Sequence, residues 1–189
     1  MMSPEDFQFV STAARWAAVW HEGQYRKAWE PRVPYLAHPA TVAMLAAQAG
    51  VPAEAVAAAY LHDVIEDCGI TVEELADRVS PGVARIVSAV TESKELPWVE
   101  RKSAYRERIA AAGAEAAWVA WADHVANVTD YGTLAQDPEA LAAAFPHARW
   151  HLCLAHERAV VEVVRHHVSF EAVDMLEAAI VRMARAVGE

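Results

Sequence analysis

The stretch AEAVAAAYLHDVIED, residues 53–67, changes character abruptly in its middle. Its first nine residues are apolar except for Glu54, and five of them are alanine. Alanine has the highest helix propensity, and a helix that is apolar on most faces is normally buried. The stretch therefore predicts a buried helix that ends in a run of ionisable side chains, His62-Asp63 and then Glu66-Asp67.

Ionisable groups at the end of a buried helix need compensation, because burying an unpaired charge costs several kcal/mol. If the helix continues to residue 67, His62 and Glu66 lie one turn apart on one face, and Asp63 and Asp67 repeat that relation on the adjacent face. A divalent cation would compensate this group, since it binds neutral imidazole and ionised carboxylate. A salt-bridged helix end is the alternative, but acids at a helix C-terminus oppose the helix dipole and favour the functional interpretation.

Two residues elsewhere in the chain can complete such a site. His38 precedes Pro39, which predicts an extended backbone at the mouth of a helix that begins at the proline. Asp123 lies in the almost wholly apolar stretch 116–128, where an isolated carboxylate needs a partner, and Asn127 follows one turn later on the same face. Two imidazoles and two carboxylates suit manganese, iron or zinc better than calcium. A capping role for His38 and a salt bridge for Asp123 are the alternatives.

The remainder of the chain favours an all-α fold. The 189 residues are 55% hydrophobic and include only 7 glycines, and no segment alternates with period two. Helical spacing and capping residues predict helices over about 4–21, 39–50, 53–67, 81–90, 97–113 and 114–131, a short one from residue 71, and others from 138 and 169. We expect a single compact multi-helix bundle over residues 1–189, with a motif-bearing core at about 21–131 and C-terminal helices at about 137–187 completing it.

Charge and cysteine content narrow the class of partner. Lys and Arg number 16 against 26 Asp and Glu, a formal net charge of −10, which argues against nucleic-acid binding. A small phosphorylated ligand remains compatible if the site carries its own positive charge. Cys68 and Cys153 form no CxxC pattern, and neither a signal peptide nor a long uncharged apolar run is present. We expect a cytoplasmic protein without a membrane partner, and the sequence leaves a homo-oligomer open.

Five motifs, in this order, resemble the HD-superfamily hydrolase domain of RelA/SpoT proteins, and most closely the stand-alone small alarmone hydrolases. They are Arg26-Lys27, PYLAHP at 34–39, YLHDVIEDC at 60–68, the segment 90–102 with its Glu-Arg-Lys end, and ADHVAN at 122–127. The resemblance covers residues from about 21 to about 131. It implies an all-α HD domain that uses Mn²⁺, or another divalent transition metal, to hydrolyse the 3′-pyrophosphate of ppGpp or pppGpp to GDP or GTP and pyrophosphate.

The resemblance also assigns roles to residues. His38, His62, Asp63 and Asp123 match the family's metal ligands. Glu66 and Asp67 match the acidic pair that positions or deprotonates the attacking water. The expected substrate contacts are Arg26 and Lys27 near base and ribose, Asn127 on the nucleotide, Lys94, Arg101 and Lys102 around the leaving pyrophosphate, and Trp150 in place of a stacking tyrosine. The alternatives are a solvated face for the three basic residues and a core position for the tryptophan.

The last motif differs from the family pattern and leaves other functions open. Ala120, His124 and Ala126 stand where the family commonly has lysine, a basic residue, and an aromatic residue or histidine. A second hypothesis therefore keeps the metal and changes the substrate to an adenine alarmone such as ppApp or to the 2′-phosphate of NADPH. A third is a nucleotide-binding module without catalysis, against which the retained Glu66 and Asp67 argue.

Overall fold

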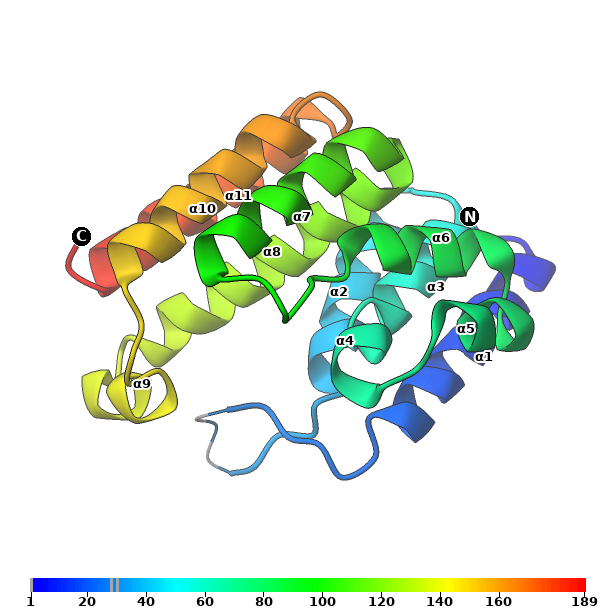
Figure 1. The fold of residues 1–189 in the computed structure, drawn as a ribbon, viewed down its shortest axis with the longest axis horizontal. Coiled ribbons are helices and arrows are strands. Elements are labelled where there is room, and N and C mark those ends of the chain that lie inside the picture. Colours follow the sequence, from blue (N-terminus) through cyan, green and yellow to red (C-terminus); the bar gives the residue numbers. More distant parts are fainter. Residues whose placement is uncertain (1, 28, 30) are drawn as a thin grey trace.

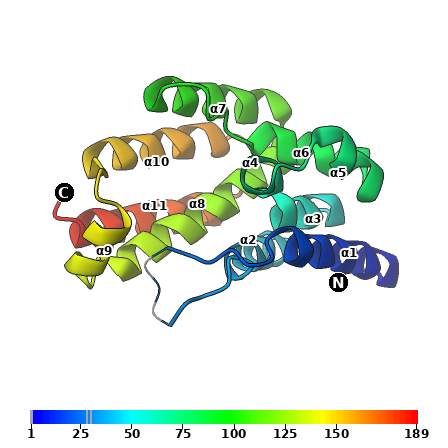
Figure 2. The ribbon, with the colours of Figure 1, turned by 60° about the horizontal axis from the view of Figure 1, so that its bottom comes forward.

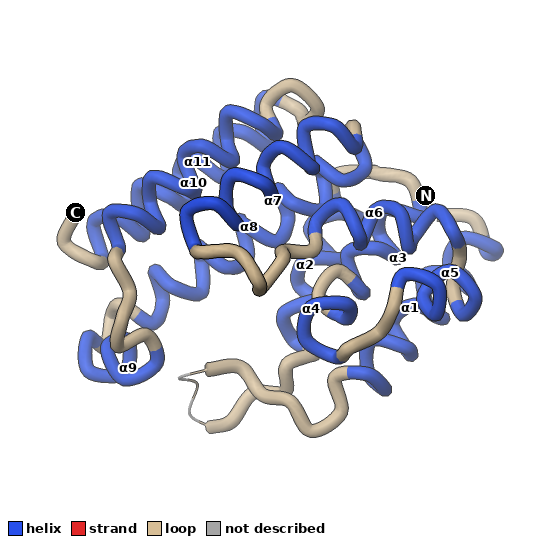
Figure 3. Tube along the Cα trace, viewed as in Figure 1, coloured by secondary structure: helices blue, strands red, loops and turns tan. Residues whose placement is uncertain are grey.

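The computed structural model describes residues 2–27, 29 and 31–189, and throughout these residues it contains helices, turns and loops but no strand (Figures 1 and 3). The predicted all-α fold is confirmed. An isolated bridge between Tyr25 and Pro34 closes the loop that follows the first helix. The helices are α1 (Pro4–Trp20), α2 (Ala37–Gln48), α3 (Ala53–Leu61), α4 (Val64–Cys68), α5 (Val72–Arg78), α6 (Pro81–Val90), α7 (Trp98–Ala112), α8 (Ala114–Leu134), α9 (Pro138–Ala144), α10 (Trp150–Val164) and α11 (Phe170–Ala186).

Two helices, α3 and α8, form the centre of the packing. Helix α3 contacts α1, α2, α6 and α8, and α8 contacts α2, α3, α6, α7, α10 and α11. Figure 2 shows α9, α10 and α11 toward the C-terminal side, α1, α3 and α5 toward the N-terminal side, and α8 extending from one group to the other. Alanine side chains allow so many helices to approach α3, and Ala55, Ala57, Ala58 and Ala59 have no exposed surface. The prediction that α3 is buried is confirmed.

Side-chain caps begin several helices where the sequence predicts a start. The hydroxyls of Ser3, Thr71, Ser80 and Ser169 each accept a hydrogen bond from the backbone N–H three residues later, at 3.0–3.3 Å. These bonds satisfy N–H groups that have no partner within the helix. Helix ends are predicted less well: α8 continues to Leu134, three residues beyond the predicted end. No helix within the described ranges is long and apolar enough to cross a membrane.

The prediction of one continuous helix over residues 53–67 is wrong. Helix α3 ends at Leu61, the chain turns at His62 and Asp63, and α4 begins at Val64. The ring Nδ1 of His62 donates a hydrogen bond to the carbonyl of Ala59 at 2.8 Å. In a continued helix that carbonyl would accept from the N–H of Asp63, so the side chain competes with the helical backbone. His62 and Asp63 therefore lie on a turn, and the expected one-turn relation to Glu66 and Asp67 along a single helix is lost.

The predicted extended backbone at His38 is also wrong. Helix α2 begins at Ala37, and the N–H of His38 donates to the carbonyl of Tyr35 at 2.9 Å. Pro39 lies in the first turn, where a missing N–H costs no intrahelical hydrogen bond. The bonding of the preceding turn thus outweighs the usual bias of a residue before proline, and the helical backbone points the His38 side chain into the interior.

Because α3 packs through alanines, we expect Ala58→Leu to destabilise the protein. The added side chain has no free volume to enter at a position without exposed surface, and overpacking of this kind costs about 1–3 kcal/mol. Urea unfolding followed by circular dichroism measures the loss. Ala178→Leu on the exposed face of α11 is the matched control and is expected to change the free energy of unfolding by less than about 0.5 kcal/mol. Equal effects at the two positions would contradict close packing of α3.

Candidate metal centre

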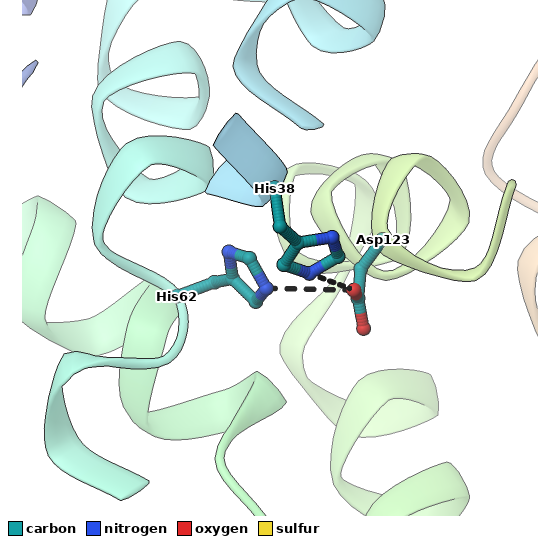
Figure 4. A group of neighbouring side chains, drawn as sticks. All are labelled: His38, His62 and Asp123. Atoms are coloured by element: carbon teal, nitrogen blue, oxygen red, sulfur yellow. Dashed lines mark ion pairs between the residues drawn. The ribbon is translucent and has the colours of Figure 1, made fainter. Parts of the chain in front are cut away.

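Three helices bring two histidines and an aspartate together inside the protein. His38 lies in the first turn of α2, His62 directly follows α3, and Asp123 lies in the middle of α8. The Oδ1 atom of Asp123 is 3.0 Å from Nε2 of His38 and 3.4 Å from Nε2 of His62. Figure 4 shows the three side chains pointing toward one another from separate parts of the chain. Both histidines are buried, at 5% and 4% exposure.

Asp63 extends this group to the four residues that the sequence predicts as ligands. Its Oδ2 atom is 3.1 Å from Nε2 of His62 and 3.7 Å from Nε2 of His38. The turn after α3 is responsible for this, because consecutive residues of a continued helix would diverge by about 100° around its axis. The Asp63 carboxylate therefore lies against both imidazole rings that face Asp123.

The protonation of His62 suits a metal ligand. A carbonyl can only accept, so the bond from Nδ1 to the Ala59 carbonyl places the ring proton on Nδ1. In the neutral ring, Nε2 then carries a free lone pair, and within the described part of the chain this buried atom has no hydrogen-bond partner. A histidine held through one ring nitrogen with the other left free is the usual arrangement of a metal-bound histidine. The donor set fits a divalent transition metal.

Two neighbouring side chains orient the carboxylates. The amide of Asn127 donates to Oδ1 of Asp123 at 2.7 Å, as expected from their one-turn spacing on α8. The hydroxyl of Tyr35 donates to Oδ2 of Asp63 at 2.6 Å and to Oδ2 of Asp67 at 3.4 Å. Tyr35 lies in the PYLAHP motif, but nothing in the sequence indicates which carboxylate its hydroxyl reaches.

The electrostatics of the four residues favour a bound positive charge. Burial lowers the pKa of His62, but the carboxylates of Asp63 and Asp123 outweigh burial and raise that pKa well above its ordinary value of 6.5. Burial conversely raises the pKa of Asp123, and the two facing histidines bring it well below the ordinary value. The His62 ring and the Asp123 carboxylate thus attract each other strongly when both are charged. A divalent cation can take the place of the positive charge on the imidazoles, so that it neutralises both carboxylates while the rings stay neutral.

A second buried group of potential ligands consists of His124, His156 and Glu157. Each of its histidines is paired with a protein side chain. Nδ1 of His124 donates to Oε2 of Glu157 at 2.7 Å, and the guanidinium of Arg106 donates to Nδ1 of His156 at 3.0 Å. Burial, together with the positive charges of His124, Lys102 and Arg106, lowers the pKa of His156, and the same positive charges oppose a bound cation. His124 therefore belongs to a hydrogen-bonded group between α7, α8 and α10.

A cavity of about 510 Å³ opens beside His38, Asp63 and Asp123, and Glu66 and Asp67 lie in its wall. Burial and the charge of Asp63 raise the pKa of Glu66 above 4.5. Asp67 is held by the Nζ atom of Lys94 at 2.8 Å. The two acids thus reach the predicted site although α4 is separate from α3.

The predicted substrate contacts divide between this cavity and its surroundings. Arg26, Lys27, Asn127, Arg101 and Lys102 line it. Lys94 is instead paired with Asp67, and Trp150 lines a neighbouring cavity of about 340 Å³. The Trp150 ring packs against Tyr131 and Phe145, whose side chains line both cavities, with ring centroids 5.9 and 6.1 Å away.

Several residues of the cavity wall were not predicted from the sequence. Asp130 pairs with the guanidinium of Arg26 at 2.6 Å, and Glu92 pairs with the basic residues of α7. Asp130 lies one turn after Asn127 on α8, a spacing that could have indicated it. Glu92 lies in a short charged loop, where no periodicity distinguishes one acid from another.

The family of the chain follows from comparison with known proteins. The model of the HD domain family matches residues 13–117. The chain belongs to the HD domain family. The match contains His38, His62 and Asp63 of the candidate centre and ends before Asp123. The resemblance predicted from the motifs is confirmed.

Curated relatives include HD-domain proteins of animals and bacteria. The chain is 38% identical over 127 residues to a Xenopus tropicalis protein named guanosine-3′,5′-bis(diphosphate) 3′-pyrophosphohydrolase MESH1, covering 66% of this chain and 70% of that one. It is 41% identical over 87 residues to a Vibrio cholerae protein named guanosine-3′,5′-bis(diphosphate) 3′-pyrophosphohydrolase, covering 46% of this chain. The matched part spans only 12% of the length of that bacterial relative.

Solved structures share the fold. A metazoan orthologue of SpoT, described as hydrolysing ppGpp, superposes with a TM-score of 0.75 at 24% identity and covers 100% of this chain and 98% of its own. A Listeria monocytogenes protein superposes with a TM-score of 0.68 at 25% identity, covering 79% of this chain and 97% of its own. The helical arrangement is therefore that of known HD-domain structures.

Removal of the Tyr35 hydroxyl is expected to weaken metal binding. Tyr35→Phe keeps the ring but leaves Oδ2 of Asp63 without its donor, and loss of such an outer hydrogen bond typically costs about 10–100-fold in metal affinity. Isothermal titration with Mn²⁺ measures the dissociation constant. Tyr60→Phe, on α3, is the control and is expected to bind Mn²⁺ as the unmodified protein does. Unchanged affinity in Tyr35→Phe would show that this hydroxyl does not orient a ligand.

Proposed function

We propose that this HD domain is a Mn²⁺-dependent hydrolase that removes the 3′-pyrophosphate of guanosine alarmones, converting ppGpp to GDP and pppGpp to GTP. The observation that carries the proposal is the meeting of the buried His38 and His62 rings with the half-buried Asp123 carboxylate, with Asp63 beside them. The names of the animal and bacterial relatives support the choice of reaction.

The four converging side chains would hold the metal ion. When bound, a divalent ion in such a site lowers the pKa of a water molecule and offsets negative charge on phosphate oxygens. Asn127 and Tyr35 keep the carboxylates of Asp123 and Asp63 oriented toward the centre. Because both donors are hydrogen-bonded before any ligand arrives, little reorganisation is required on binding.

Glu66 is better suited than Asp67 to accept the proton of the attacking water. Burial and neighbouring acids raise the pKa of Glu66, which brings it closer to the range of an effective general base. Asp67 lies 2.8 Å from the ammonium of Lys94, whereas Glu66 accepts a longer hydrogen bond of 3.3 Å from the N–H of Glu92 and lies 3.6 Å from the same ammonium. We therefore assign proton acceptance to Glu66 and orientation of the acidic wall to Asp67.

The reaction requires the water oxygen to bond to phosphorus while the bond from that phosphorus to the 3′ oxygen breaks. The 3′ oxygen leaves with the nucleoside and takes up a proton, and pyrophosphate is the second product. Arg26, Lys27 and Asn127 line the cavity, where they can contact base and ribose, and Arg101 and Lys102 can contact phosphate oxygens. The proposed partner is thus a small nucleotide, which agrees with the expected cytoplasmic location.

Asp123→Asn tests the centre directly. The amide lacks the charge that binds the cation, so pyrophosphate release from ppGpp with Mn²⁺ should fall by more than the roughly 100-fold that loss of an outer partner can cost. Pyrophosphate release is measured by a coupled phosphate assay, and circular dichroism checks that helix content is unchanged. Asp174→Asn, on the exposed face of α11, is the control and should retain full activity. Full turnover by Asp123→Asn would remove this carboxylate from the mechanism.

The identity of the substrate is tested with a panel of nucleotides. Under one set of conditions with Mn²⁺, ppGpp and pppGpp are expected to be hydrolysed faster than ppApp or NADPH, with pyrophosphate as the product and no release of 2′-phosphate. Preferential turnover of ppApp or of NADPH would replace the guanosine alarmone as substrate. Tight binding of ppGpp without turnover, with any divalent transition metal, would indicate a binding module instead.

A further inference from the structure

Glu92 occupies a central position in the cavity wall that the proposed reaction does not use. It lies in the loop between α6 and α7, and its side chain is 13% exposed. Oε1 of Glu92 is 2.5 Å from Nζ of Lys102, and Oε2 is 2.8 Å from Nε of Arg101. One carboxylate therefore bridges two cations that line the same cavity as the candidate metal centre.

The backbone around Glu92 is held on both sides. Its own N–H donates to Oε2 of Glu66 at 3.3 Å, and the guanidinium of Arg108 on α7 donates to the carbonyl of Thr91. The Thr91 hydroxyl in turn donates to the carbonyl of Val87 on α6 at 2.8 Å. The Glu92 carboxylate is thus presented from a loop that is fixed to α4, α6 and α7.

Arg101 and Lys102 require such a bridge in order to act together. Consecutive residues of a helix project about 100° apart around its axis, so their side chains diverge unless something draws them together. Long basic side chains also lose rotamer freedom when they are immobilised. Glu92 forms an ion pair with Nε of Arg101 and with the Lys102 ammonium, and among the described residues no hydrogen bond engages the terminal guanidinium nitrogens of Arg101, which can donate to an anion.

We infer that Glu92 is a positioning residue that joins Arg101 and Lys102 into one preorganised anion-binding pair for the pyrophosphate part of the substrate. The inference rests on the proposed function for the identity of the substrate and deepens it, because it names the element that sets affinity for the leaving group. Preorganised charged donors bind a diphosphate with less ordering cost than free side chains do.

Glu92 could also have the opposite effect and weaken pyrophosphate binding. A carboxylate between two cations also repels an incoming anion, so if repulsion dominates, removing its charge tightens binding. Glu92→Gln removes the charge and retains the shape. Glu92→Asp keeps the charge but shortens the side chain by one methylene. It therefore shows whether the length of the side chain matters when its charge is unchanged.

The test is a double-mutant cycle read out by binding of inorganic pyrophosphate. Isothermal titration is performed on the full chain with the same Mn²⁺ concentration in cell and syringe. We expect Glu92→Gln and Lys102→Gln each to weaken binding about tenfold, and the double variant to lose about tenfold rather than about a hundredfold, because both changes disrupt one unit. Glu92→Asp is expected to weaken binding several-fold, and Glu95→Gln, exposed on the same loop, to stay within about twofold.

Three results would overturn the inference. The first is tighter pyrophosphate binding by Glu92→Gln, and the second is a loss of about a hundredfold in the double variant. The third is absence of pyrophosphate binding by the unmodified chain. Turnover of ppGpp is measured in parallel on the same preparations. An unmodified protein that is inactive yet shows the coupled losses would contradict the proposed hydrolase alone. An active protein with independent losses would contradict the role of Glu92 alone.

Discussion

The carboxylate of Asp123 lies in the middle of a helix whose other buried positions are almost all apolar, and its position depends on the two imidazoles that face it. An isolated carboxylate in such an interior would be strongly destabilising. His38 and His62 reach it at 3.0 and 3.4 Å from separate helices, which requires α2, α3 and α8 to pack closely. The alanines of α3 make that approach feasible, so the packing of the core and the geometry of the centre have a common cause.

The break after α3 follows from the same requirement. A continuous helix would direct His62 and Asp63 to different faces, whereas at the observed turn the His62 ring contacts both the Asp63 and the Asp123 carboxylate. The hydrogen bond from Nδ1 of His62 to the Ala59 carbonyl orients the ring and fixes the proton away from the centre. A single side-chain to backbone bond therefore interrupts the helix and prepares a ligand atom at once.

The wall of the cavity carries both signs of charge. Acidic residues, among them Asp63, Glu66 and Asp123, share it with Arg26, Lys27, Arg101 and Lys102. These basic side chains supply the local positive charge that the proposed polyanionic substrate needs in a chain with a net charge of −10. Glu92 contacts Arg101 and Lys102 and so belongs with the basic residues of the wall.

The helical class and most helix starts could be predicted from the sequence alone, because alanine content and capping hydroxyls are local signals. His38, His62, Asp63 and Asp123 do lie together, and their roles as ligands stay predictions. The turn at residues 62–63, the helical backbone of His38 and the partners of Tyr35 and Glu92 became evident only from the three-dimensional packing. Each of these depends on which atoms of distant segments compete for a hydrogen bond or a charge, and no local pattern encodes that.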